Sequence, residues 1–96
     1  MPYIKQEDRK WFDGLEACFA KNPAANAGEL NYLLTVMVHS YLKSKTADGS
    51  YEANYQAMND VMGALEGCKL ELYRRRIAPY EDIKIKDNGD VFITNQ

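Results

Sequence analysis

The sequence predicts a small, mainly α-helical domain of the α+β type, with three helices followed by a C-terminal β-hairpin. Three observations support this fold class. Apolar residues recur at helical spacing in three segments, breaks rich in proline, glycine or small residues separate those segments, and an alternation of two replaces the helical spacing after Pro79. With 96 residues, 46% of them hydrophobic and 27% charged, the chain predicts a single domain over residues 1–96.

The first predicted helix covers about residues 6–21. Its apolar positions follow helical spacing and are Trp11, Phe12, Leu15, Cys18 and Phe19. Acidic residues come early in this segment and Lys21 comes late, an order that suits the helix dipole. Asn22 and Pro23 end the helix, because a proline disfavours helical geometry in the residue that precedes it.

The second predicted helix covers residues 27–45. Asn26 and Glu29 stand three apart, the spacing at which a cap side chain and a carboxylate each satisfy a free backbone amide, so a helix should begin here. A continuous apolar stripe follows, formed by Leu30, Leu33, Leu34, Met37, Val38, Tyr41 and Leu42. Lys43 and Lys45 lie near its carbonyl end.

The third predicted helix is the longest, at about 51–77, and is expected to run antiparallel to the second. Its apolar positions are Tyr51, Tyr55, Met58, Met62, Leu65 and Leu72. Gly63 and Gly67 stand four apart within it, although a glycine inside a helix costs about 0.8–1 kcal/mol relative to alanine. They therefore predict the close approach of another backbone, which belongs either to the second helix or to another subunit.

The predicted hairpin covers about residues 83–94. Ile83 and Ile85 alternate with lysines, Asn88 and Gly89 form a turn dipeptide, and Val91 resumes the alternation together with Ile93. Because a lone two-stranded hairpin is marginal in water, this element should pack on the helices or pair with another chain.

Composition limits the classes of function. A net charge of −2 and a pI near 5.3 argue against a broad basic surface for long nucleic acid, so any anion site must be local. Cys18 and Cys68 lack metal-site spacing and His39 is the single histidine, so neither a metal nor a cofactor is expected, and both thiols are predicted to be reduced core residues. No stretch approaches the ~20 apolar residues that span a bilayer, and the N-terminus lacks a signal-peptide pattern, which predicts a cytoplasmic protein.

The sequence does not predict an enzyme, and no catalytic residue is proposed. His39 lies mid-helix beside the apolar stripe, where a surface or hydrogen-bonded, partly buried histidine is more common than a general base. Paired acids such as Glu81 and Asp82 are usually part of a solvated face.

Three consecutive arginines at the predicted end of the third helix are the main candidate site, and they have two interpretations. Glu71 stands three and four residues before Arg74 and Arg75, which is the usual spacing for ion pairs on a helix surface. Arg76 instead continues the apolar spacing and needs an anionic partner, either Glu81 or Asp82 or an external ligand.

An external ligand would bind through guanidinium forks and aromatic faces. Tyr73 and Tyr80 flank the arginines and offer rings for stacking, a combination with which proteins hold a base together with its phosphate. In a homo-oligomer the helix ends of several chains would converge on a small nucleotide. The candidate ligand-binding residues are Arg74, Arg75, Arg76, Tyr73 and Tyr80, and the candidate packing or oligomer residues are Gly63, Gly67, Tyr51, Tyr55 and Met58.

Several segments together resemble a known family. MPYIKQEDR, GELNYLLT and GALEGCKLELYRRRIAPYEDIKIKDNGDVF are similar to a family of short uncharacterised proteins carried by bacteriophages and by some bacteria and archaea, and the GELNY, KLELYRR, APYED and NGDV motifs carry this resemblance. It implies a small accessory protein in the cytoplasm of an infected bacterium that binds a host component or signal. It brings no catalytic residues.

These observations lead to two hypotheses. The first is a non-enzymatic, anti-defence protein that sequesters a small anionic nucleotide signal in a homo-oligomer. The alternative is a protein-interaction module that inhibits a host protein directly, through the face of Tyr51, Tyr55 and Met58 or through the hairpin edge.

Overall fold

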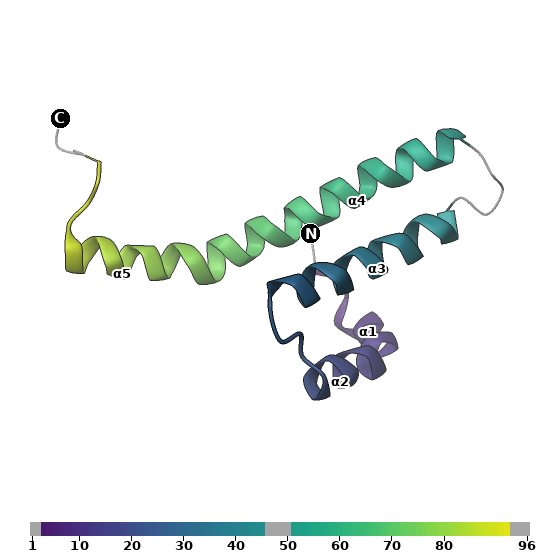
Figure 1. The fold of residues 1–96 in the computed structure, drawn as a ribbon, viewed down its shortest axis with the longest axis horizontal. Helices are drawn as coiled ribbons and strands as arrows, with labels where there is room; N and C mark the ends of the chain where they lie inside the picture. Colours follow the sequence, from purple (N-terminus) through teal and green to yellow (C-terminus); the bar gives the residue numbers. More distant parts are fainter. Residues whose placement is uncertain (1–2, 46–50, 93–96) are drawn as a thin grey trace.

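The computed structural model describes residues 3–45 and 51–92, and the regular elements within these ranges are helices (Figure 1). In chain order they are α1 (Gln6–Arg9), the 3₁₀ turn η1 (Lys10–Phe12), α2 (Asp13–Lys21), α3 (Ala27–Lys45), α4 (Tyr51–Leu72), the π-helical turn η2 (Tyr73–Ile77) and α5 (Ala78–Asn88). The predicted helical character is confirmed. None of the helices in these ranges has both the length and the apolar content needed to cross a membrane.

The entry into α3 is fixed by side chains, as the spacing of Asn26 and Glu29 predicts. The Glu29 amide donates to the Asn26 side-chain oxygen at 2.9 Å, so one of the free N–H groups of the first turn is satisfied. The Glu29 carboxylate in turn accepts a hydrogen bond from the Ala25 amide at 2.9 Å, one residue earlier than in a standard capping box. This reciprocal pair orients the chain as it enters the helix.

The α4 helix lies beside α3 in antiparallel orientation and continues through η2 into α5 without a break (Figure 1). The helix therefore does not end near residue 77, where the sequence predicts its end. Pro79 falls in the first turn of α5, where a missing N–H and a fixed φ are tolerated. The π-helical turn before it, closed by a bond from the Ala78 amide to the Tyr73 carbonyl, lets the helix pass the proline.

The predicted C-terminal β-hairpin over residues 83–94 is wrong, because the described part of that segment contains no strand. Ile83 and Ile85 lie in α5, and residues 93–94 lie outside the described ranges. Gly89 adopts a positive φ of 88°, and its amide donates to the Ile85 carbonyl at 2.8 Å. The Asn-Gly pair thus ends a helix and does not form a hairpin turn, because both roles use the positive φ that glycine allows.

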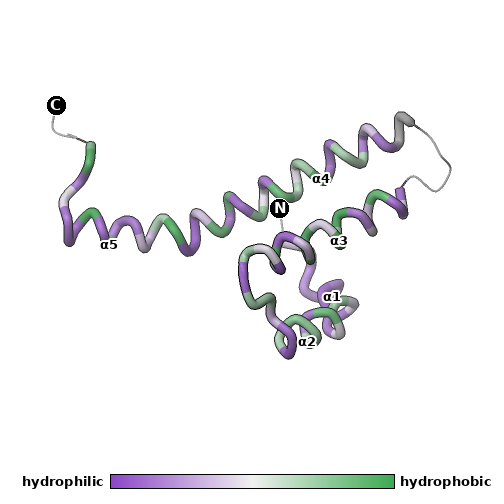
Figure 2. The backbone as a smooth tube through the Cα atoms, viewed as in Figure 1, coloured by the Kyte–Doolittle hydropathy of each residue, from purple (hydrophilic) through white to green (hydrophobic). Residues whose placement is uncertain are grey.

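The single chain is extended and buries little of its apolar surface. Its radius of gyration is 18.4 Å, compared with about 12.5 Å for a compact domain of this length. Among the side chains that the structure describes, only Ala57 is buried, at 2% exposure. Figure 2 shows hydrophobic residues along both α3 and α4, interspersed with hydrophilic ones. The helices therefore carry apolar faces that this chain does not cover by itself.

Two glycines should respond in opposite directions to substitution by alanine. No atom lies within 4 Å of a Cβ added at Gly63, so Gly63→Ala should raise the free energy of unfolding by about 0.8–1 kcal/mol through helix propensity. Gly89→Ala should lower it by about 1–3 kcal/mol, because its φ of 88° and ψ of 150° strain a side chain. Urea unfolding followed by circular dichroism measures both. If Gly63→Ala instead lowered the free energy of unfolding, the backbone of another chain would have to lie against Gly63.

Candidate functional site

The arginines lie in the middle of a long helix, within the π-helical turn Tyr73–Ile77, which we call the arginine turn. The sequence predicts a helix end here, with cations near exposed carbonyl groups. Because α5 continues the helix, the Tyr73 carbonyl is taken by the Ala78 amide, and the predicted helix end is absent at this point. The helix dipole therefore does not account for these three positive charges.

Glu71 binds two of the three arginines, as the helical spacing predicts. Arg74 Nη2 lies 2.5 Å from Glu71 Oε1, and Arg75 Nε lies 3.9 Å from the same oxygen. The Tyr3 hydroxyl donates to that oxygen as well and accepts a hydrogen bond from Arg75 Nη1 at 3.2 Å. The Glu71 side chain is only 19% exposed. One carboxylate thus joins the N-terminal segment to the helix and partly neutralises the arginine turn.

These contacts shift the ionisation of Glu71. The hydrogen bond from Tyr3, and then the one from Arg74, lower the pKa of the Glu71 carboxyl from its ordinary value of 4.5. The same pairing raises the pKa of Arg74. Glu71 is therefore a carboxylate at neutral pH and is poorly suited to act as a general base, because its proton affinity is reduced and its oxygen is already hydrogen-bonded.

Arg76 differs from its neighbours. Its guanidinium has no ion pair or hydrogen bond to the part of the chain that the structure describes, whereas Arg74 and Arg75 both have one. Arg75 and Arg76 border an open hollow of about 640 Å³. Its lining residues are Tyr3, Cys68, Glu71, Leu72, Arg75 and Arg76. The hollow combines two cations with one carboxylate, one aromatic ring and one apolar wall.

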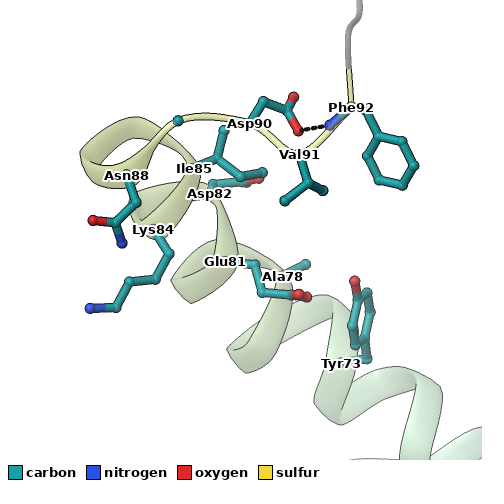
Figure 3. Close-up of a pocket in the computed structure, with 11 residues that line it drawn as sticks. Tyr73, Ala78, Glu81, Asp82, Lys84, Ile85, Asn88, Asp90, Val91 and Phe92 are labelled. Atoms are coloured by element: carbon teal, nitrogen blue, oxygen red, sulfur yellow. Dashed lines mark hydrogen bonds between the residues drawn. The ribbon is translucent and has the colours of Figure 1, made fainter.

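The structure does not bring the two predicted stacking residues to this hollow. Tyr73 lies on the same side of the helix as Glu81, beside a second pocket of about 440 Å³ (Figure 3). Hydrogen bonding to the Glu81 carboxylate raises the pKa of the Tyr73 phenol. The Tyr80 ring lies below Lys84, whose Nζ is 5.5 Å from the ring centroid. Glu81 thus interacts with Tyr73 and does not reach Arg76.

Tyr3 lies beside the arginines, where the sequence predicts Tyr73 and Tyr80, and the spacing of residues gives no sign of this role. It stands 68 residues before Glu71, so only the folded path of the N-terminal segment brings the two together. Of the predicted packing residues on α4, Tyr55 is 63% and Met58 is 48% exposed, while the side chain of Tyr51 lies outside the described part. Gly67 is half-buried.

The cysteines and the histidine add no further chemistry to the site. Cys18 and Cys68 are free, but both are exposed, so the prediction that they are core residues is wrong. The reason is that the described helices enclose almost no core in the single chain. His39 lies exposed on α3. Within residues 3–45 and 51–92, no three potential ligand side chains of His, Cys, Asp or Glu are grouped closely enough to hold a metal ion.

A protein-family match covers residues 1–91 and is described as "Domain of unknown function (DUF6899)". The chain belongs to this family. No curated protein and no solved structure matches the chain. Membership in this family assigns neither a ligand nor a catalytic residue.

The anchoring of Tyr3 to Glu71 should depend on pH. Because the Glu71 pKa is lower in the folded state, its contribution to stability is present above its ordinary value of 4.5 and is lost as the pH falls through the folded value. NMR shifts of the Tyr3 and Ile4 amides should therefore change below pH 4.5. Glu71→Gln should remove this transition, whereas Glu66→Gln should retain it. A transition that persists unchanged in Glu71→Gln would contradict the assignment.

Proposed function

We propose that this chain is a non-enzymatic, anti-defence accessory protein that sequesters a small anionic nucleotide signal as a homo-oligomer. In the setting that the sequence resemblance implies, it acts in the cytoplasm of a phage-infected bacterium. One observation carries the proposal: the arginine turn has three guanidinium groups, Glu71 is the single carboxylate bound to them among the described residues, and Arg76 is left beside an open hollow. Positive charge thus remains available to an external anion.

A nucleotide fits this surface better than a simple ion. Guanidinium groups bind phosphate through paired N–H donors, and the Tyr3 ring beside Arg75 offers a face on which a base can stack. The chain's net charge of −2 disfavours a long polyanion, because binding along a phosphate backbone needs a continuous basic face. A short ligand with several phosphates matches a small patch in which the arginines outnumber the one carboxylate bound to them among the described residues.

Sequestration requires more than one chain. Consecutive residues of a helix point in different directions around its axis, so the three arginines of one turn cannot converge on one phosphate. Glu71 also holds Arg74 and Arg75 in place. Arginine turns from neighbouring chains are needed to surround a multiply charged ligand, which is why the proposal includes a homo-oligomer.

Isothermal titration calorimetry with cyclic dinucleotides and ADP-ribose-type nucleotides tests ligand capture. Arg76→Ala should weaken binding at least tenfold, because a hydrogen bond to a charged group contributes about 1.5–3 kcal/mol. Lys84→Ala is the control that also removes one positive charge, since Lys84 lies over the Tyr80 ring and does not line the hollow, and it should leave affinity unchanged. Absence of heat with every nucleotide, in a protein whose oligomer is intact, would overturn the proposal.

The alternative, a protein-interaction module that inhibits a host protein, is favoured by a different observation. In the face of Tyr51, Tyr55 and Met58, the described side chains of Tyr55 and Met58 are exposed on α4, and exposed apolar faces of this kind commonly bind a partner helix. The hairpin edge is no longer part of this alternative, because residues 83–92 contain no strand.

A pull-down from bacterial lysate separates the two functions. The interaction module should retain a stoichiometric polypeptide, and Met58→Glu should abolish its capture, because a charge on an apolar interface must lose its hydration. Glu66→Gln, on the same helix, should retain the partner. Ligand capture predicts instead that the purified protein carries a small molecule and no stoichiometric polypeptide. Equal capture by Met58→Glu would contradict the assignment of this face.

A further inference from the structure

An apolar groove runs between α3 and α4 and meets the hollow beside the arginine turn at Cys68, which lines both. It encloses about 370 Å³ and takes its walls from both helices. The side chains that matter for the argument are Leu34, Met37 and Tyr41 from α3, and Val61, Leu65 and Cys68 from α4. Met37 is 53% and Leu65 is 39% exposed in the single chain, although both belong to the predicted apolar stripes. The groove is therefore hydrophobic surface that faces water in an isolated chain.

The charged group in the wall of the groove does not prevent an apolar partner from binding there. Asp60 is the one ionisable acid among the lining residues, and its oxygens already have donors. Gln56 Nε2 donates to Asp60 Oδ1 at 2.9 Å, and the Tyr41 hydroxyl donates to Oδ2 at 3.4 Å. Since a carboxylate with hydrogen-bond donors is less costly to desolvate than a bare one, the groove can be covered.

The amount of exposed surface indicates what kind of partner covers it. The accessible surface of the chain is 8788 Å², which exceeds the roughly 5,600 Å² expected for a compact protein of 11.0 kDa by about 3,200 Å². An obligate homodimer buries about 2,000–5,000 Å² in total, or about 1,000–2,500 Å² from each chain. The surplus on one chain is thus sufficient for such an interface, and a small ligand or short peptide would leave most of it exposed.

We propose that a second copy of this chain occupies the groove, so that two α3–α4 pairs pack face to face as a four-helix bundle around a two-fold axis. The same groove on both chains then forms an isologous interface, in which apolar side chains meet apolar side chains. This arrangement gives the apolar side chains that line the groove the core that they lack in one chain. It also supplies the oligomer that ligand capture requires, but it does not depend on any ligand.

Light scattering combined with thiol labelling tests this dimer on the wild-type protein. The mass should be twice 11.0 kDa. Cys18 and Cys68 are both exposed in the single chain, but only Cys68 lines the groove, so a maleimide reagent should modify Cys18 readily and Cys68 many times more slowly. A wild-type mass of one chain, or equal labelling of the two thiols, would overturn the proposal.

Two methionine substitutions provide a matched pair of variants. Met37→Glu places a charge in the groove and should give a monomer in which Cys68 reacts as fast as Cys18. Met62→Glu introduces the same charge on α4 outside the groove lining, at a residue that is 67% exposed, and should remain a dimer. If Met37→Glu does not fold, the mass and the thiol labelling of the wild-type protein still test the dimer. Dissociation by Met62→Glu alone would move the interface away from the groove.

The ligand and the dimer can fail separately. A dimer with a protected Cys68 that binds no nucleotide would refute ligand capture and leave the interface intact. An oligomer that binds nucleotide but in which Cys68 reacts as fast as Cys18 would refute this interface and leave ligand capture at the arginine turn intact. If a helix of another protein occupies the groove in place of the second copy, the light-scattering mass would correspond to one copy of this chain and one of the partner. That result would also refute the proposal.

Discussion

The apolar faces of α3 and α4 impose the main physical constraint on this protein, because most helical stability in proteins comes from packing an apolar face. Here the two helices lie side by side, yet Met37 and Leu65 remain substantially exposed, and Ala57 on α4 is the one buried residue among the side chains that the structure describes. The excess surface of the single chain is larger than the area that each chain of an obligate dimer buries. In the proposed dimer the second chain would provide the missing half of the core, so folding and assembly should be coupled.

The arginine turn depends on the same long helix. Because the helix passes Pro79 by means of a π-helical turn, Arg74, Arg75 and Arg76 lie mid-helix. Glu71 then organises the turn through ion pairs and through Tyr3, while Arg76 remains beside the hollow. In one chain these groups diverge. A two-fold assembly of α3 and α4 would place two such turns in one dimer. The apolar interface would then supply the second charged site that ligand capture requires.

Local features of the sequence predicted local structure well. The cap formed by Asn26 and Glu29 and the pairing of Glu71 with the arginines depend on spacings of three and four residues, which a helix brings together directly. The hairpin prediction failed because the Asn-Gly pair, with Gly89 at positive φ, is equally suited to end a helix. The contact of Tyr3 with Glu71 could not be foreseen, because nothing in the spacing specifies which distant segments meet.

Thermal unfolding followed by circular dichroism over a dilution series tests the coupling of folding and assembly most directly. If a second chain completes the core, Tm should rise with protein concentration, because mass action favours the assembled folded state. The helical signal should then be lost in one transition. A Tm that stays constant across the series would show that a single chain folds by itself and would contradict the account.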